Sequence, residues 1–181
     1  MASLIPISPA TYALVASEVA TFWQLEAFNN YRLAEAFPIF QLITDVDENE
    51  NVTIGLIPTS IWHFQVLAGV EPLGFAHARV FGPRDRDWRL EGVFRSGIAG
   101  NVIQAINLLD GQPDIDGEAC LLFSPLLKLT ALFIRTEDLN LSRFVVTNVF
   151  DTEVETLQIL DLATFVSQLG RIDPSPGITF E

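Results

Sequence analysis

The sequence contains one cysteine, one methionine and one lysine in 181 residues. The single thiol, Cys120, excludes an intrachain disulfide and a cysteine-based zinc site. Its neighbours Ala119 and Leu121 are apolar, which indicates a buried structural thiol. The N-terminal residues have no basic region followed by a long apolar run, so we expect no secretory signal. Low cysteine content is typical of cytoplasmic proteins, and we expect that location.

Positive charge is also scarce, because 10 Lys and Arg residues face 23 Asp and Glu residues, for a net charge of −13. Proteins that bind nucleic acid or anionic lipid need a basic face to contact phosphate groups. The charge therefore argues against both kinds of partner. The most apolar stretch, 119–134, is too short for a membrane span and is interrupted by Pro125 and Lys128.

Apolar residues are abundant, at 49% of the chain, whereas charged residues make up only 18%. Charged residues usually account for about 25% of a soluble domain. The excess of apolar side chains indicates either a large core or apolar surface that contacts a partner.

The first 38 residues have the pattern of a long helix. Ser8 suits the N-cap and Pro9 suits the first helical position. Apolar residues then recur at three- and four-residue spacing over 10–37, which predicts one long helix, or two helices with a break near Asn29 and Asn30. Pro38 is expected to end this helical region.

The rest of the sequence alternates short apolar segments with turn residues. Strands are expected over 39–44, 52–57, 62–67, 75–81, 88–94, 120–123, 127–135, 143–150 and 156–159. Helices are expected over 98–109, with Ser96 as the cap, and over 160–169. Because most strands follow strands, we predict an α+β fold: a mostly antiparallel sheet with the long N-terminal helix and two further helices packed on one face. We expect a single domain over 1–181, with a loose tail at 173–181.

Motifs for catalysis and cofactor binding are absent. The acidic run 45–51 has Glu50 and Leu56 where a calcium loop needs glycine and glutamate, so a solvated turn is the better interpretation. The sequence has no G-x-S-x-G, dinucleotide-binding or P-loop pattern. The two histidines, His63 and His77, lack metal-ligand spacing, and structural roles in strands are expected. We therefore predict no cofactor, no metal site and no catalytic residue.

The most distinctive feature is a cluster of arginines. Half of the basic residues lie between positions 79 and 95: Arg79, Arg84, Arg86, Arg89 and Arg95. Arginine binds carboxylates and phosphates with two hydrogen bonds. The acidic residues between them also fit an exposed hairpin held by its own ion pairs.

Two hypotheses follow for function. The first is an interaction or assembly module that self-associates or docks to another protein through apolar and arginine-bearing surface. The alternative is a small-molecule-binding protein or an enzyme, with a pocket for an anionic ligand between helix and sheet. Under either hypothesis the predicted binding residues are His77, Arg79, Arg89 and Arg95. The sequence leaves open whether any reaction is catalysed.

Overall fold

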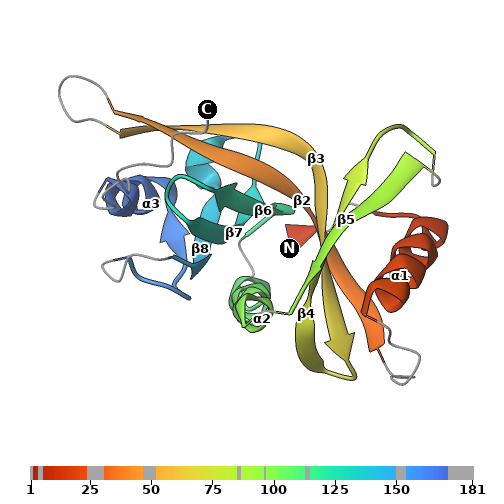
Figure 1. The fold of residues 1–181 in the computed structure, drawn as a ribbon. Coiled ribbons are helices and arrows are strands. Elements are labelled where there is room, and N and C mark those ends of the chain that lie inside the picture. Colours follow the sequence, from red (N-terminus) through yellow and green to blue (C-terminus); the bar gives the residue numbers. More distant parts are fainter. Residues whose placement is uncertain are drawn as a thin grey trace.

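The fold is a twisted sheet with helices on both of its faces (Figure 1). The computed structural model describes residues 2–3, 6–23, 31–46, 52–84, 87–95, 97–112, 115–149 and 154–170. The helices are α1 (Pro9–Trp23), α2 (Ile98–Asp110) and α3 (Leu162–Leu169), with a 3₁₀ turn η3 (Leu139–Leu141). The strands are β1 (Ala2–Ser3), β2 (Tyr31–Val46), β3 (Val52–Ala68), β4 (Glu71–Val80), β5 (Trp88–Phe94), β6 (Gly117–Ser124), β7 (Leu129–Arg135), β8 (Arg143–Asn148) and β9 (Leu160–Asp161).

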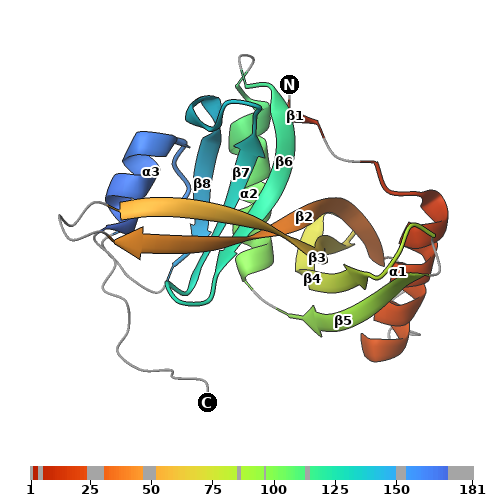
Figure 2. The same cartoon turned by 90° about the horizontal axis from the view of Figure 1, so that it is seen from above.

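The sheet is mostly antiparallel, and this part of the fold prediction is confirmed. Its strand order is β5-β4-β3-β2-β6-β7-β8-β9, and β1 pairs with β6 outside this path. The pairs β2–β6 and β1–β6 are parallel, so the sheet is mixed. The long β2–β3 hairpin crosses the whole molecule, with β4, β5 and α1 at one end and β6–β8, α2 and α3 at the other (Figure 2).

The long N-terminal helix was predicted wrongly over residues 31–37, while 24–30 lie outside the described residues. Residues 31–37 belong to β2, where Tyr31 pairs with Ala68 and Phe37 pairs with His63. Leu, Ala and Glu in this segment favour a helix locally, but pairing along a long partner strand outweighs such weak propensities. The Tyr31 hydroxyl donates to the Ala16 carbonyl at 2.9 Å, which ties the start of β2 to α1.

Pro38 lies inside β2 and ends no helix. A proline has no N–H for the ladder, and it is tolerated where the register slips. The pairing of β2 with β3 shifts between Pro38 and Phe40, and the Thr59 hydroxyl donates to the Ile39 carbonyl at 2.7 Å. With this irregularity, β3 runs as one strand through 52–57 and 62–67, which the sequence pattern separates into two.

The middle of the molecule agrees with the predictions. β4 and β5 form the expected antiparallel hairpin, and α2 covers the expected helix. The N-cap of α2 is Gly97, while Ser96 lies outside the described residues. β2 and β3 are joined by 47–51, which also lies outside them, as does the predicted tail 173–181.

The C-terminal third differs in one strand and at the boundaries of its other elements. The strand expected over 156–159 is wrong, because the short strand β9 comes after it and pairs with Arg143 and Phe144. α3 begins after Asp161, whose carboxylate accepts from the Thr164 N–H at 2.8 Å, so a side-chain cap sets the start of this helix.

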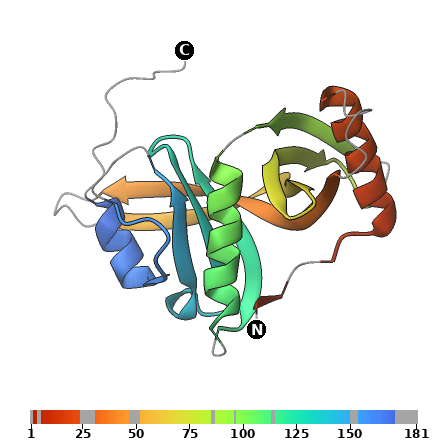
Figure 3. The ribbon, with the colours of Figure 1, turned by 90° about the horizontal axis from the view of Figure 1, so that it is seen from below.

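The helices do not share one face, contrary to the prediction. One core cluster joins Val102 and Leu109 of α2 to Leu132 of β7. Another joins Phe165 of α3 to Phe133 on the opposite face of the same strand. Continuous apolar runs in β6–β8 make both faces of these strands apolar, so both need a covering helix. Figure 3 shows α2 lying across β6–β8 with α1 at the far end of the molecule.

A third cluster lies under α1, where Val15 and Val19 pack with Phe64 and Ala76 of the sheet. The Glu18 carboxylate of this helix accepts a hydrogen bond from the Leu90 N–H at 2.8 Å. Because β5 ends the sheet, this contact occupies one of the donors that an edge strand would otherwise expose. The α1 helix therefore holds the β4–β5 hairpin in place.

Candidate binding strip on the β4–β5 hairpin

The β4–β5 hairpin brings three of the four predicted binding residues onto one face of the sheet. His77 lies opposite Gly92, and Arg79 lies opposite Arg89. Residues that face each other across an antiparallel pair project from the same side. Phe75 pairs with Phe94 on that side, and the Arg89 guanidinium lies 5.6 Å from the centre of the Phe81 ring. We name this set the hairpin strip: Phe75, His77, Arg79, Phe81, Arg89 and Phe94.

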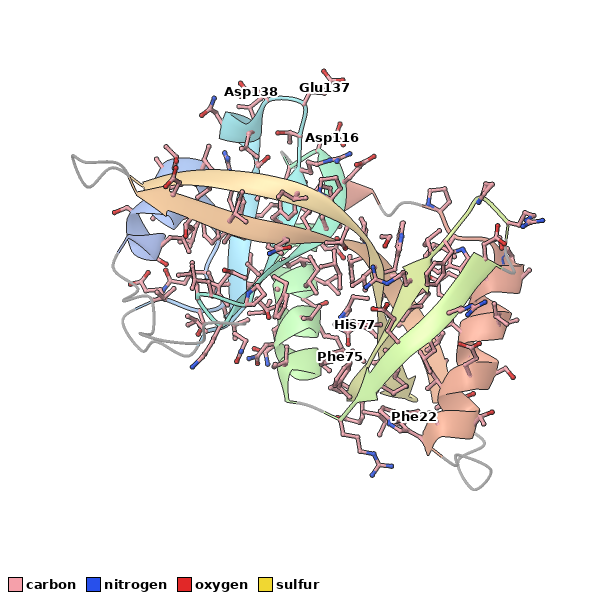
Figure 4. The ribbon with its side chains drawn as sticks, turned by 45° about the horizontal axis from the view of Figure 1, so that its top comes forward. Phe22, Phe75, His77, Asp116, Glu137 and Asp138 are labelled. Carbon is pink, nitrogen blue, oxygen red and sulfur yellow. The ribbon has the colours of Figure 1, made fainter. Side chains whose placement is uncertain are left out.

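The strip exposes large aromatic side chains. Phe81 is 64% exposed and Phe94 is 44% exposed. Phe94 is stacked on Phe75, with ring centres 5.0 Å apart. Figure 4 shows Phe75 and His77 on the side of the hairpin that faces α2. Sequence reasoning named the basic residues here and missed the phenylalanines, although their two-residue spacing from His77 and Arg79 on β4 was a usable signal.

Arg79 is engaged within the hairpin. Its guanidinium forms an ion pair with both carboxylate oxygens of Glu91 and donates to the Ser60 hydroxyl at 3.1 Å. The hydrogen bond to Glu91 raises the pKa of Arg79. Arg84 is paired in the same way with Asp87 at 3.1 Å. Arg79 and Arg84 thus fit the interpretation of an exposed hairpin that is held by its own ion pairs.

Arg89 and Arg95 lie over aromatic rings and are exposed. Arg95 does not join the strip: its guanidinium lies 5.4 Å from the centre of the Trp23 ring on α1. Arg89 therefore remains as the strip's cation that is not held in an ion pair between described residues. A guanidinium on an aromatic face keeps its N–H groups free to contact a carboxylate.

Beside the strip, on the same face of the neighbouring strand β3, lies a row of buried polar side chains. His63 pairs with His77 across β3 and β4, and its Nδ1 lies 3.2 Å from Nε2 of His77. On its other side, His63 Nε2 lies 3.1 Å from the Gln65 side-chain nitrogen. Gln65 and His63 are almost completely buried, and Phe75 stacks on the His63 ring at 4.8 Å. The sequence could not reveal this row, because the strand register brings together histidines fourteen residues apart.

Burial keeps both imidazoles neutral. Desolvation lowers the pKa of His63 well below the usual 6.5, and the neighbouring His77 adds to the shift. Desolvation also lowers the pKa of His77 to about 4, although the Glu91 carboxylate opposes the change. Both rings are therefore uncharged at neutral pH, so they form a hydrogen bond with each other instead of repelling one another.

The histidine pair is not part of a metal-binding cluster in the described residues, where no group of three or more His, Cys, Asp or Glu side chains converges. The ring centres lie 5.4 Å apart and the facing nitrogens 3.2 Å apart, so the rings meet edge to edge as in a hydrogen bond. Cys120 is buried, as predicted, and desolvation raises the pKa of its thiol to about 12.

A shallow hollow of about 710 Å³ lies far from the strip, lined by Asp116, Gly117, Glu118, Arg135, Thr136 and Glu137. Figure 4 shows Asp116 and Glu137 near the top of the view, away from Phe75 and His77 at its centre. The Arg135 guanidinium is paired with Glu118. Carboxylates predominate here, so the hollow is poorly suited to the anionic ligand of the alternative hypothesis.

No protein-family model, no curated protein and no solved structure matches this sequence. None of the helices in the described ranges is both long and apolar enough to cross a membrane.

Proposed function

We propose that this protein is an interaction module that binds another protein through the hairpin strip. One observation carries the proposal: two exposed phenylalanines share the face of Arg89. Phe81, just beyond β4, lies under the Arg89 guanidinium, and Phe94 lies opposite Phe75 at the other end of β5. Aromatic residues and arginine dominate the energetically important positions of protein interfaces. The exposed rings provide apolar area for a partner to cover, and Arg89 provides a polar anchor.

The surroundings of the strip support this role. The Arg79–Glu91 ion pair and the α1 contact to β5 hold the hairpin in one conformation, so less conformational entropy is lost on binding. Phe75 stacks on both Phe94 and His63, and His63 lies beside His77 on the same face. We further propose that the module works in the cytoplasm, as the single cysteine suggests.

A second apolar surface provides the comparison. Ile57 and Phe123 flank Gln41 across three strands, and Ile43 lies two residues along β2. All three apolar side chains are between 45% and 48% exposed. This sheet patch contains no arginine. The strip is therefore the better candidate for a specific interface, and the sheet patch serves as a control surface.

The proposal can be tested with peptides selected from a random display library against the purified protein. We expect the selected peptides to bind the strip, so Phe94→Ser and Arg89→Ala each weaken binding by about tenfold or more, the effect of an interface hot spot. The matched controls are Ile57→Ser on the sheet patch and Leu141→Ser on η3, where Leu141 is 62% exposed. Peptides that lose affinity for a control variant but keep it for both strip variants would overturn the proposal.

A further inference from the structure

In the buried row beside the strip, the donors and acceptors fix the direction of each hydrogen bond. The Gln65 side-chain nitrogen faces His63 Nε2 at 3.1 Å. An amide nitrogen can only donate, so His63 Nε2 accepts this bond. A neutral imidazole has one proton, and that proton of His63 must therefore lie on Nδ1.

The same reasoning extends to His77. His63 Nδ1–H faces His77 Nε2 at 3.2 Å and donates to it. His77 is also neutral, so its own proton lies on Nδ1. No described residue forms a hydrogen bond with this Nδ1, and it is not among the fully buried polar atoms without a partner.

The orientation of the Gln65 amide decides this direction. If the Gln65 oxygen faced His63, every proton in the row would move to the opposite nitrogen, and His77 Nδ1 would be a bare acceptor. In the observed orientation Gln65 Oε1 is buried without a partner. The charged groups that face His77 are Glu91 and its partner Arg79.

We propose that Gln65 acts through His63 as a positioning residue, which makes His77 Nδ1–H a hydrogen-bond donor on the strip. A donor on the same face as Arg89 fits the carboxylate of an Asp or Glu side chain on the partner. The partner chemistry rests on the proposed function of the strip, whereas the proton positions in the row stand independently of it.

The proton positions are measured first, by long-range ¹H–¹⁵N correlation spectra of the imidazole rings at neutral pH. We expect both histidines to show the Nδ1–H form in the wild-type protein. In Gln65→Met the amide donor is lost, and we expect the ¹⁵N shifts of both rings to move to values intermediate between the two tautomers. Gln168→Met, a matched change at another buried glutamine on α3, leaves both rings unchanged.

A wild-type Nε2–H signal at either histidine would overturn the direction of the row. A pure Nδ1–H signal for His77 in folded Gln65→Met would remove Gln65 as the positioning residue. If that variant does not fold, the wild-type spectra still decide the direction.

The partner chemistry is tested with the strip-binding peptides described above. Replacing the acidic residue of a peptide with its amide is expected to weaken binding to the wild-type protein about tenfold, as for a charged hydrogen bond. The loss should be several-fold smaller with His77→Phe. Peptides that bind the strip with no such dependence on His77 refute the carboxylate inference and leave the proposed function standing. Peptides that bind elsewhere refute the proposed function and leave the proton positions unchanged.

Discussion

Acid should destabilise this protein through its two histidines. Both have a lower pKa in the folded protein than the usual 6.5, because they are desolvated. Below pH 6.5 the unfolded protein therefore binds protons that the folded protein does not, and stability falls with pH. For His77 the loss ends near its folded pKa of about 4.

The magnitude follows from the proton uptake. For each histidine that stays neutral in the folded protein, every pH unit below 6.5 lowers the free energy of unfolding by about 1.4 kcal/mol. Between pH 7 and pH 5 the free energy of unfolding therefore falls by about 2 kcal/mol per histidine. His77 accounts for about 2 kcal/mol over this range, and His63, whose pKa is also lowered, adds to the loss. Carboxyl groups with ordinary pKa values titrate mainly below pH 5 and add little.

The assay is urea unfolding at pH 7 and pH 5, followed by tryptophan fluorescence. Trp62 and Trp88 are in contact at 5.7 Å within the core under α1, so their emission reports loss of this part of the sheet. The protein has no other histidine, so replacing His77 leaves His63 as the one histidine that titrates. The reference is His77→Gln, whose amide oxygen can accept the His63 Nδ1–H.

We expect His77→Gln to lose about 2 kcal/mol less than the wild-type protein when the pH falls from 7 to 5. The difference between the two proteins cancels the contribution of the carboxyl groups. Equal losses in both proteins would show that His77 takes up a proton in the folded state at pH 5, and the argument from desolvation would fail.

Three further predictions test the packing. Gly74→Ala should lower the urea midpoint strongly, because a Cβ at Gly74 would lie 2.0 Å from a main-chain oxygen of β5, whereas Gly97→Ala, with nothing within 4 Å, should change it little. Phe144→Ala should lower the free energy of unfolding by about 3–5 kcal/mol in the same assay, because Phe144 is fully buried. Phe123 is half exposed, so Phe123→Ala should lower it far less. Equal losses in the two variants would contradict the burial pattern. Cys120 should react with iodoacetamide at pH 8 only after unfolding, since its thiol is buried and its pKa is raised; modification of the folded protein at the rate of the unfolded protein, followed by mass spectrometry, would refute this.

Local patterns were sufficient for most elements of the fold. Alternation of apolar residues and turn residues predicted the β4–β5 hairpin, and Gly97 and Gly111 bound the helix that three- and four-residue spacing indicated. The same spacing failed over 31–37, where a helix-favouring sequence pairs with β3. Local propensities differ by less than about 1 kcal/mol per residue, so pairing along a strand as long as β2 decides the outcome.

The candidate site was predicted in part. The density of arginines drew attention to the hairpin, and the register places His77, Arg79 and Arg89 on one face of it. Arg95 was grouped with them by proximity in sequence, yet its guanidinium lies over Trp23. The position of a side chain at the end of a strand depends on the residues that pack beside it. For Arg95 that residue is Trp23 of α1.

The amino-acid sequence by itself determined the α+β class, the antiparallel pairing of neighbouring segments, the burial of Cys120 and the unusual arginine density, because each depends on residue type and short spacing. The tertiary structure alone decided that β2 is a strand from residue 31, that α2 and α3 take opposite faces, and that Gln65, His63 and His77 form one hydrogen-bonded row. These features depend on which distant segments meet and in what register, and no local pattern encodes a register between strands.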